Sequence, residues 1–232
     1  MEQIDKVYLY GASGHAKVVM DIARQAYVDV PCLIDDNQMV NELSGIPVVH
    51  SADGLSPIIV TIGDCQIRRK IVQKLGGREY LTVIHPTSII ADSATIGYGT
   101  VVMAGAIFNP FVKVGNHCII NTGASLDHDV KIGDFVHVAP HCTLCGEVEV
   151  GEDTWIGAGT TVIQGIHIGT DCFIGAGSVV VKDIPDGCLC YGNPARVIKK
   201  FNQNADDERL SSIMGGGRIA PPVYAAFYNY VA

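Results

Sequence analysis

The sequence predicts a small α/β domain followed by a parallel β-helix of triangular cross-section. Two observations predict the β-helix: a large apolar residue recurs every six positions from Ile84 to Val180, and glycine recurs every 18 positions from Gly97 to Gly169. A third observation predicts the α/β domain, because residues 5–80 alternate between short apolar runs and runs with helical spacing. A period of six fits neither a helix of 3.6 residues per turn nor a plain alternating strand, but it fits a short strand followed by a corner.

Residues 1–80 predict strands and helices in β-α-β order. Strands are expected at residues 6–10, 30–34, 46–49 and 57–62, and helices at residues 16–26 and 67–75. The first helix has one apolar side, which consists of Val18, Val19, Ile22 and Ala23. This order is typical of a small parallel sheet with helices, and we assign it to a domain of residues 1–80.

Residues 81–185 are expected to form the coils, within a domain of residues 81–200. The large residue of each hexad should point into the core, together with the small residue two positions before it. The glycines that recur every 18 positions are expected at one corner per coil, where glycine tolerates positive φ and close backbone approach. The segment 191–196 interrupts the repeat and is expected to cap the column. Residues 201–232 are a tail to which the sequence assigns no role.

Composition restricts the class of protein. The chain has 232 residues, of which 17% are charged, and a net charge of −8, which argues against nucleic acid or an anionic membrane surface as main partner. The sequence shows neither a signal peptide nor an apolar run of membrane-spanning length, so we expect a cytoplasmic protein. Cys118, Cys142 and Cys172 occupy the small inward position, and a packing role is favoured there over zinc or redox chemistry at the Cys142–Cys145 pair.

A glycine-containing loop connects the first strand to the first helix. Its sequence is Gly11-Ala-Ser13-Gly14-His15, and a strand, a glycine turn and a helix N-terminus together form a candidate anion site. Asp35 and Asp36 follow the second strand, where a carboxylate can meet a ribose hydroxyl or a base. The loop lacks the GxGxxG spacing, so an ordinary tight turn with an acidic surface loop is the alternative.

A second candidate site lies in the predicted coils. His128 comes two positions after the inward Leu126, where the strand should turn, so its ring is expected outside the core between Asp127 and Asp129. Gly146 follows 18 positions later and should stack on His128 at about one strand spacing, ~5 Å, with its N–H open to a carbonyl oxygen. His137 precedes the inward Val138 and should also point outward. An outward histidine on a solenoid is commonly just solvated, and we interpret His50, His117 and His167 as surface or structural residues.

The hexad repeat resembles the left-handed β-helix of the hexapeptide-repeat acyltransferases. Over residues 5–200, the order of the glycine loop, the acidic pair, Ile62-Gly63 and the hexads is similar to that of bacterial UDP-amino-sugar N-acetyltransferases and sialic acid O-acetyltransferases, which have a Rossmann-like N-terminal domain. The resemblance implies acetyl-CoA as co-substrate, no metal cofactor, and a homotrimer with its sites between neighbouring subunits.

The resemblance also implies roles for individual residues. It implies His128 as general base, Asp129 as its partner and Asn121 as an accessory polar group. It implies contacts to acetyl-CoA from His137, Gly146 and Ala158. The residues implied to contact the nucleotide sugar are Gly11, Ser13, Gly14 and His15 at the diphosphate, Asp35 and Asp36 near the uridine, and Ile62 and Gly63.

The leading hypothesis is an acetyl-CoA-dependent N-acetyltransferase that acts on a UDP-linked 4-amino-4,6-dideoxy sugar. O-acetylation of sialic acid or another sugar is the second hypothesis, because a histidine base can serve either nucleophile. A zinc hydratase on the same kind of prism would need ligands such as His117, His137 and His141, whose spacing does not reproduce that family's ligands. A non-catalytic scaffold or sugar-binding module would have no need of the Asp-His-Asp corner.

Overall fold

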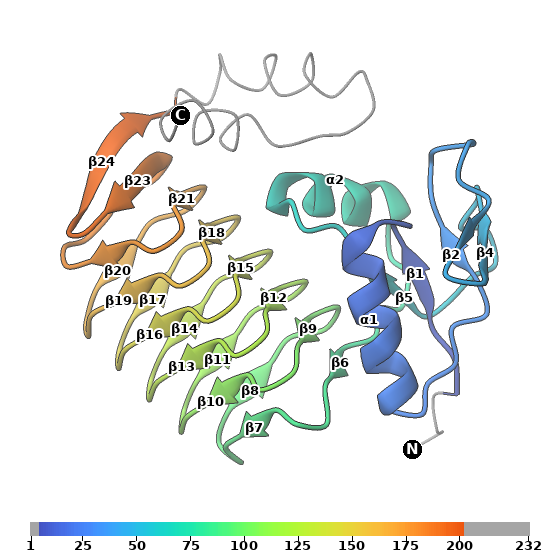
Figure 1. The fold of residues 1–232 in the computed structure, drawn as a ribbon, viewed down its shortest axis with the longest axis horizontal. Helices are drawn as coiled ribbons and strands as arrows, with labels where there is room; N and C mark the ends of the chain where they lie inside the picture. The colour runs from blue at the N-terminus through green and yellow to red at the C-terminus, as the bar shows by residue number, and fades with distance from the viewer. Residues whose placement is uncertain (1–4, 202–232) are drawn as a thin grey trace.

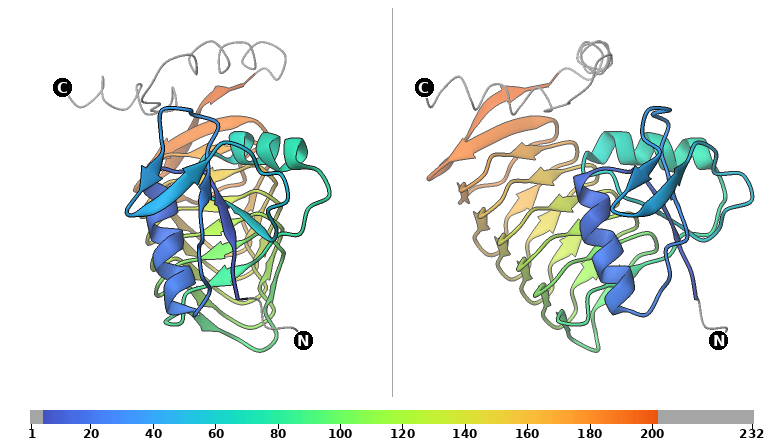
Figure 2. Two further views of the ribbon diagram at one scale, coloured as in Figure 1. Left: turned by 90° about the vertical axis from the view of Figure 1, so that its right-hand side faces the viewer. Right: turned by 45° about the vertical axis from the view of Figure 1, so that its right-hand side comes forward.

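The computed structural model describes residues 5–201, so the tail predicted at residues 201–232 lies almost entirely outside the described residues. An N-terminal α/β unit stands beside a three-sided left-handed parallel β-helix (Figure 1). Figure 2 shows that the α/β unit lies along the side of the coils rather than over their end. Both predicted architectures are therefore confirmed.

The α/β unit contains one five-stranded sheet and two helices. The strand order is β3-β4-β2-β1-β5, parallel except for an antiparallel hairpin between β3 and β4. Its elements are β1 (Tyr8–Tyr10), α1 (Gly14–Gln25), β2 (Leu33–Ile34), β3 (Glu42–Leu43), β4 (Ile46–Val49), β5 (Ile58–Val60) and α2 (Cys65–Leu75). The observed strands β1, β2 and β5 are shorter than predicted, and β4 has the predicted bounds. The strand β3 was not predicted from the sequence.

The helix α1 begins two residues earlier than its apolar spacing suggests. Ser13 is the N-cap in an extended conformation, so Gly14 and His15 belong to the first turn and not to the preceding loop. The buried side of α1 consists of Ala16, Val19, Ile22 and Ala23. Val18, which the apolar spacing groups with Val19, Ile22 and Ala23, is 42% exposed and lies outside the buried side. Positions i, i+3 and i+7 from Ala16 define the buried stripe, and Val18 falls beside it.

The β-helix has three faces, each a ladder of short strands that pair in parallel with their equivalents on the neighbouring coils. The docking face, which carries the α/β unit, contains β6 (Val83–Ile84), β9 (Val101–Val102), β12 (Ile119–Ile120), β15 (His137–Val138), β18 (Trp155–Ile156) and β21 (Phe173–Ile174). The second face contains β7 (Ile89–Ile90), β10 (Ile107–Phe108), β13 (Ser125–Leu126), β16 (Thr143–Leu144), β19 (Thr161–Val162) and β22 (Val179–Val180). The third face contains β8 (Thr95–Ile96), β11 (Lys113–Val114), β14 (Lys131–Ile132), β17 (Glu149–Val150) and β20 (His167–Ile168).

The chain runs from the docking face to the second face, then to the third face, and back. Three corners result, and we name each by one residue: the Asn121 corner between the docking and second faces, the His128 corner between the second and third faces, and the His117 corner between the third and docking faces. Since the cross-section has three sides, the His128 corner lies opposite the docking face.

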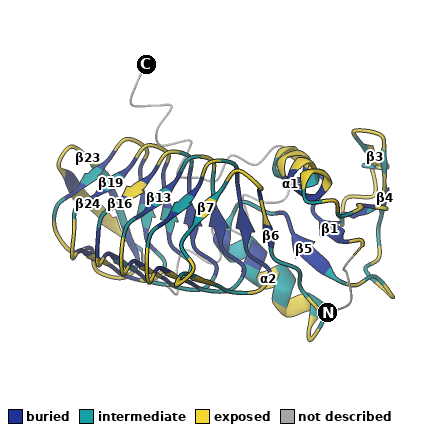
Figure 3. Ribbon diagram, turned by 90° about the horizontal axis from the view of Figure 1, so that it is seen from below, coloured by how far each residue is buried: buried dark blue, intermediate teal, exposed yellow. Residues whose placement is uncertain are grey.

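The interior of the prism confirms the hexad prediction. The large hexad residues from Val102 to Val180 are at most 5% exposed, and the small residues Cys118, Cys142 and Cys172 are at most 2% exposed. In Figure 3 the strands of the coils are largely buried, and most of the exposed residues lie in the corner loops. Ile84 is 37% exposed because it lies in the first coil, which has no coil beneath it.

The corners correct one expectation about glycine. From residue 99 to residue 177, every sixth residue has positive φ, and this position accepts non-glycine residues such as Phe111, His117 and Asp129. The glycine series from Gly97 to Gly169 does not occupy this position. A Cβ on Gly97 would lie 2.5 Å from the carbonyl carbon of Gly115, so these glycines are required by close approach between coils and not by their φ.

An antiparallel hairpin ends the column. It consists of β23 (Cys188–Gly192) and β24 (Ala195–Lys200), and β23 pairs in parallel with β21. The hairpin extends the ladder of the docking face and closes the core beneath it with Cys188, Cys190 and Ala195. The expected cap is therefore confirmed.

Candidate functional site

His128 lies outside the core at the corner that bears its name. Its side chain is 55% exposed, and Nδ1–H donates a hydrogen bond to Asp129 Oδ2 at 3.0 Å. This bond directs Nε2 away from Asp129 and leaves it able to accept a proton. The hydrogen bond with Asp129 raises the pKa of His128 above its ordinary value, and the negative charges of Asp127, Asp129 and Glu147 raise it further. The arrangement suits a general base.

Asp127 fixes the turn that presents His128. Its Oδ1 accepts hydrogen bonds from His128 N and from Asn109 Nδ2, both at 2.8 Å. The bond from Asn109 is the main cause of the lowered pKa of Asp127, so the carboxylate stays charged near neutral pH. Asn109 was not predicted as a site residue, although it precedes Asp127 by one full coil and therefore lies directly beneath that residue.

Gly146 stacks on His128 as the coil period predicts. A Cβ on Gly146 would overlap the imidazole and lie 2.5 Å from its Cε1, so the ring occupies the space that a side chain would take. The Gly146 N–H forms no hydrogen bond with any residue of the described range 5–201. It can therefore donate to a ligand.

A pocket of about 490 Å³ adjoins this corner. It extends from Asp129, the partner of His128, across the third face and over the next two coils. Its lining consists of Asp129, Lys131, Glu147, Glu149, Gly165, Ile166 and His167. The pocket has mixed charge, since Lys131 Nζ pairs with Glu149 Oε1 at 2.6 Å.

The N-terminus of α1 forms a second polar region in the α/β unit. Gly11 has φ 110°, and a Cβ there would lie 2.6 Å from Ile62 Cδ1, so this tight turn requires glycine. Ser13 makes no side-chain cap, and the Cα of Gly14 faces open space. The Nε2 atom of His15 is buried and has no hydrogen-bond partner among residues 5–201. Burial lowers the pKa of His15 to about 4, with a smaller contribution from the charge of Arg68, so the ring is neutral.

The acidic pair after β2 makes structural contacts. Asp35 accepts a hydrogen bond from Ala12 N at 2.8 Å and another from Asn37 N at 2.9 Å, so it orders the glycine loop. Asp36 accepts from Tyr10 Oη at 2.8 Å and pairs with Lys74 at 3.0 Å. The structure therefore brings Asp35 against the glycine loop and leaves Asp36 exposed at its edge.

The loop after β5 meets the docking face at His137. Gly63 O accepts a hydrogen bond from His137 Nδ1–H at 3.0 Å, and His137 Nε2 accepts one from Asn121 Nδ2 at 3.1 Å. His137 does point out of the prism, but the α/β unit covers it and leaves it 5% exposed. Burial lowers its pKa to about 3, and the charge of Arg68 contributes in the same direction.

The predicted site residues fall into two groups on different sides of one chain. His128, Asp129 and Gly146 share the His128 corner. Asn121 and Ala158 lie at the Asn121 corner, and His137 lies on the docking face between it and the α/β unit. The docking face is opposite the His128 corner, so a single chain does not bring the base to the α/β unit. Asn121 contacts His137 and not His128.

Sequence reasoning missed the residues that join the two units. Arg68 is 1% exposed and donates hydrogen bonds to His117 O at 2.8 Å and Phe135 O at 2.6 Å. Trp155 packs on His137, with ring centroids 4.1 Å apart. Nothing in the local pattern distinguishes Arg68 from its surface neighbour Arg69, whereas Trp155 could have been found by counting one coil forward from His137.

No group of three or more His, Cys, Asp or Glu side chains within residues 5–201 is arranged to hold a metal ion. No helix in that range is long and apolar enough to cross a membrane.

Comparison with known families divides the chain in the same way as the fold. Residues 6–75 match the family described as the PglD N-terminal domain. Residues 111–146 and 147–182 match the bacterial transferase hexapeptide family. A curated relative, UDP-N-acetylbacillosamine N-acetyltransferase from Bacillus subtilis, is 38% identical over 110 residues. An uncharacterized protein of Acanthamoeba polyphaga mimivirus is 35% identical over 101 residues. The matches span 51% and 21% of these two relatives' lengths.

Solved structures match over most of the chain. Perosamine N-acetyltransferase from Caulobacter crescentus, a histidine variant in complex with CoA and GDP-perosamine, has a TM-score of 0.81 and 38% identity, and the match covers 85% of this chain and 99% of that one. The acetyltransferase domain of PglB from Neisseria gonorrhoeae has a TM-score of 0.78 and 35% identity, with 84% and 100% covered. The same domain is also known in complex with acetyl coenzyme A. The chain therefore belongs to the hexapeptide-repeat sugar acetyltransferases that carry a PglD-type N-terminal domain.

Proposed function

We propose that this protein transfers the acetyl group of acetyl-CoA to the amine of a nucleoside-diphosphate-linked amino sugar. The acceptor that we expect is a UDP-linked 4-amino-4,6-dideoxy sugar. Residues 1–80 would hold the nucleotide sugar, and residues 81–200 would hold acetyl-CoA. The observation that carries the proposal is the placement of His128, backed by Asp129 and with its ring over Gly146.

The chemistry assigned to this corner is acyl transfer. The sugar nitrogen forms a bond to the thioester carbonyl carbon while His128 Nε2 takes a proton from that nitrogen. The carbon–sulfur bond then breaks, and the proton passes to the departing thiolate to give free CoA. Asp129 stabilises the imidazolium through Nδ1–H. The Gly146 N–H is the candidate donor to the oxygen on which negative charge develops.

The pocket beside Asp129 is the candidate site for the acyl carrier. It shares Asp129 with the base and continues along the third face. CoA is bound in the structure of the perosamine N-acetyltransferase, and acetyl coenzyme A in that of the PglB domain. The pocket supplies both charged and apolar groups to a carrier that contains amides and an alkyl chain.

The acceptor site is proposed at the N-terminus of α1. The helix N-terminus favours negative charge, and Gly14 leaves its backbone open to a diphosphate. The unpartnered His15 Nε2 supports the proposal, because a buried polar atom without a partner is destabilising unless a ligand completes it. Ile62, Gly63, Asp35 and Asp36 would line the same region, which is supported by the closeness of Ile62 to Gly11 and by the hydrogen bond from Ala12 N to Asp35.

The separation of the two groups supports the homotrimer that we propose. The base lies at the corner opposite the docking face, so acceptor and base can meet when a neighbouring copy presents its His128 corner to the docking side of this chain. Cyclic symmetry repeats the same contact around the ring. Asn121 and Ala158 would then face the acyl carrier from one subunit, while His128 and Gly146 face it from the next. His137, which is 5% exposed beneath Gly63, would lie behind Asn121 and beside the acceptor loop.

A substrate screen tests the function. The purified protein is incubated with acetyl-CoA and either UDP-linked or GDP-linked 4-amino sugars, and thiol release is followed, with His128→Ala as the control. The proposal predicts turnover with an amino sugar and a loss of about 10²–10⁴-fold in the variant. Thiol release with sialic acid or another hydroxyl acceptor, and with none of the amino sugars, would contradict N-acetylation.

A further inference from the structure

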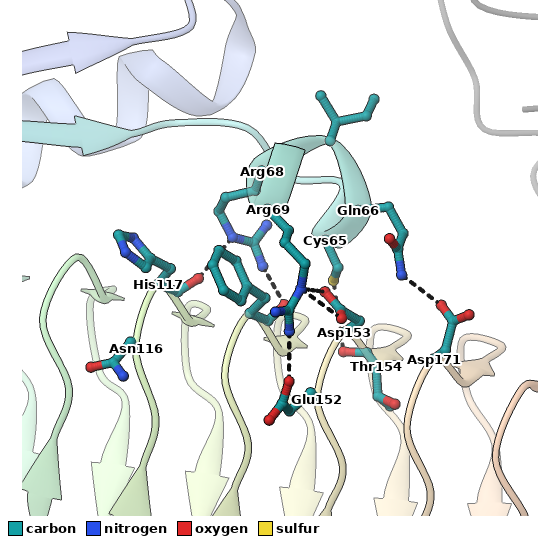
Figure 4. Close-up of polar contacts among 12 residues, drawn as sticks. Cys65, Gln66, Arg68, Arg69, Asn116, His117, Glu152, Asp153, Thr154 and Asp171 are labelled. Carbon is teal, nitrogen blue, oxygen red and sulfur yellow. Dashed lines mark hydrogen bonds and ion pairs between the residues drawn. The ribbon is translucent and has the colours of Figure 1, made fainter. Parts of the chain in front are cut away.

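Arg68 is a buried cation whose guanidinium donates hydrogen bonds to backbone carbonyl groups of two coils and of one loop. It comes from α2 and is 1% exposed. Its Nε donates to His117 O at 2.8 Å and its Nη2 to Phe135 O at 2.6 Å, so it holds two successive coils at the His117 corner (Figure 4). A guanidinium in this position is costly unless all its donors are satisfied, and here the planar fork meets carbonyls on several sides.

The remaining donor of Arg68 binds the loop that follows β5. Its Nη1 donates to Ile62 O at 2.7 Å and to Gly63 O at 3.0 Å, with a longer contact to Asp64 O at 3.3 Å. The same side chain thus fixes the loop of the acceptor site and the wall of the prism. The neighbouring Arg69 has a different kind of partner. It pairs with the side chains of Glu152 and Asp153 at 2.8 Å on the partly exposed edge of the interface (Figure 4).

Gly63 O is shared between Arg68 and His137. Because a carbonyl oxygen can only accept, His137 must carry its proton on Nδ1, and Nε2 is left to accept from Asn121. The charge of Arg68 beside this oxygen opposes a second positive charge on the ring. A chain of contacts therefore runs from α2 through the loop to His137 and on to the Asn121 corner.

We propose that Arg68 is a positioning residue, which locks the Ile62–Gly63 loop against the prism and thereby fixes His137 as a neutral hydrogen-bond acceptor at the acceptor-sugar end of the site. The inference rests on the proposed function for its kinetic consequence. The structural part of the inference, the tautomer of His137, is independent of the proposed function because it exists in the free protein. Arg68 acts through the loop and His137 and is not assigned contact with substrate.

The test compares Arg68→Lys with Arg69→Lys, two adjacent residues of the same helix. Lysine retains the charge but offers a compact ammonium in place of a planar fork, so it cannot satisfy both coil carbonyls and both loop carbonyls. In Arg68→Lys the KM for the sugar acceptor should rise by about tenfold or more, since small displacements of positioning groups are costly. The KM for acetyl-CoA should change by less than about twofold, and Arg69→Lys should change neither. Equal changes in both KM values would overturn the proposal.

A measurement on the unsubstituted protein keeps the inference falsifiable if Arg68→Lys does not fold. Nitrogen-15 NMR of the histidine rings should show His137 as the Nδ1–H tautomer and neutral at pH 5, and a folded Arg68→Lys should show a mixture of tautomers. A His137 protonated on Nε2 in the unsubstituted protein would overturn the proposal. This measurement requires no turnover, so a failure of the proposed function would be seen separately as absence of thiol release with every sugar.

Discussion

The imidazole of His128 lies against the Cα of Gly146, the residue that stands 18 positions later on the next coil. Leu126 pairs with Leu144 on the neighbouring coil. Because His128 and Gly146 each come two positions after one of these leucines, the two residues stack directly on each other. Nε2 therefore faces the backbone of the coil above while Nδ1 is held by Asp129. The position of the candidate base depends on the absence of a side chain at residue 146.

Gly146→Ala should reduce turnover without unfolding the protein. The added Cβ would displace the ring of His128, which is half exposed and free to rotate away, so the fold should tolerate the change. We expect kcat to fall by about 10–100-fold, because base catalysis depends on the position of the accepting nitrogen. Steady-state kinetics and Tm check this. Gly77→Ala is the control, since a Cβ there has no neighbour within 4 Å. An unchanged kcat in Gly146→Ala would show that catalysis does not depend on the position of the His128 ring.

Asp129→Asn should shift the pH profile of the reaction. The hydrogen bond to Asp129 is the main reason that the pKa of His128 is raised, so its loss lowers that pKa. A base must be deprotonated, and the acidic limb of kcat against pH should therefore move to lower pH, with a plateau lower by about tenfold. Asp36→Asn, which changes a carboxylate of the α/β unit, should leave the limb in place. A limb that moves to higher pH in Asp129→Asn would contradict the assignment.

Gly14→Ala separates acceptor binding from stability. Gly14 has no neighbour within 4 Å of an added Cβ and begins α1, so alanine should leave Tm unchanged or raise it, with a helix-propensity gain of up to ~1 kcal/mol. The methyl group would nevertheless occupy the space that we assign to the diphosphate. The KM for the nucleotide sugar should rise by about tenfold while the KM for acetyl-CoA stays constant. If both KM values stay constant, the diphosphate does not bind at this helix terminus.

His117→Phe tests the electrostatics of the interface between the units. His117 is buried among Tyr80, Tyr98 and Phe135, and burial lowers its pKa to about 4 from an ordinary value of 6.5. Below pH 6.5 the unfolded chain binds a proton that the folded protein does not, so stability is lost as the pH falls toward 4. This histidine should cost on the order of 2 kcal/mol of unfolding free energy between pH 7 and pH 5.

Phenylalanine should remove that loss, because it does not titrate and Phe135 already occupies the equivalent positive-φ position of the next coil. Denaturant unfolding at the two pH values provides the measurement. Exposed His167→Phe is the control for the exchange of histidine for phenylalanine at a surface position. A pH dependence of His117→Phe equal to that of the parent protein would show that His117 is not held neutral in the fold.

The prism could be predicted from sequence because its determinants are local and periodic. The hexad sets which side chains point inward, and the length of one coil sets which ones stack, so the burial of Phe108 and the contact of His128 with Gly146 followed from counting. The positions of the glycine series from Gly97 to Gly169 could be read from the sequence, but the physical reason for glycine there could not. The φ values of these glycines are not positive, and the left-handed position falls on residues as large as Phe111.

The rest depends on how two units pack, which no period in the sequence records. The hexad places the side chain of His137 outside the prism, where a residue is normally exposed. It is buried because the loop at Gly63 covers it. Arg68 and Arg69 are adjacent in sequence, yet one is enclosed by carbonyls and the other pairs with surface carboxylates. Asn121 was grouped with His128 through family resemblance, whereas the fold puts the two residues at different corners of one chain.

Subunit complementation tests the composite site most directly. His128→Ala lacks the base but retains the acceptor region, and a bulky Gly14→Trp has the opposite defect. Neither variant alone should turn over. When the two are co-expressed with different tags and mixed trimers are isolated, a site that combines the docking side of one chain with the His128 corner of the next should be intact at one of the three positions of each mixed trimer, about a third of all sites. The account predicts recovery of about that fraction of parental activity, and mixed trimers as inactive as both variants would contradict it.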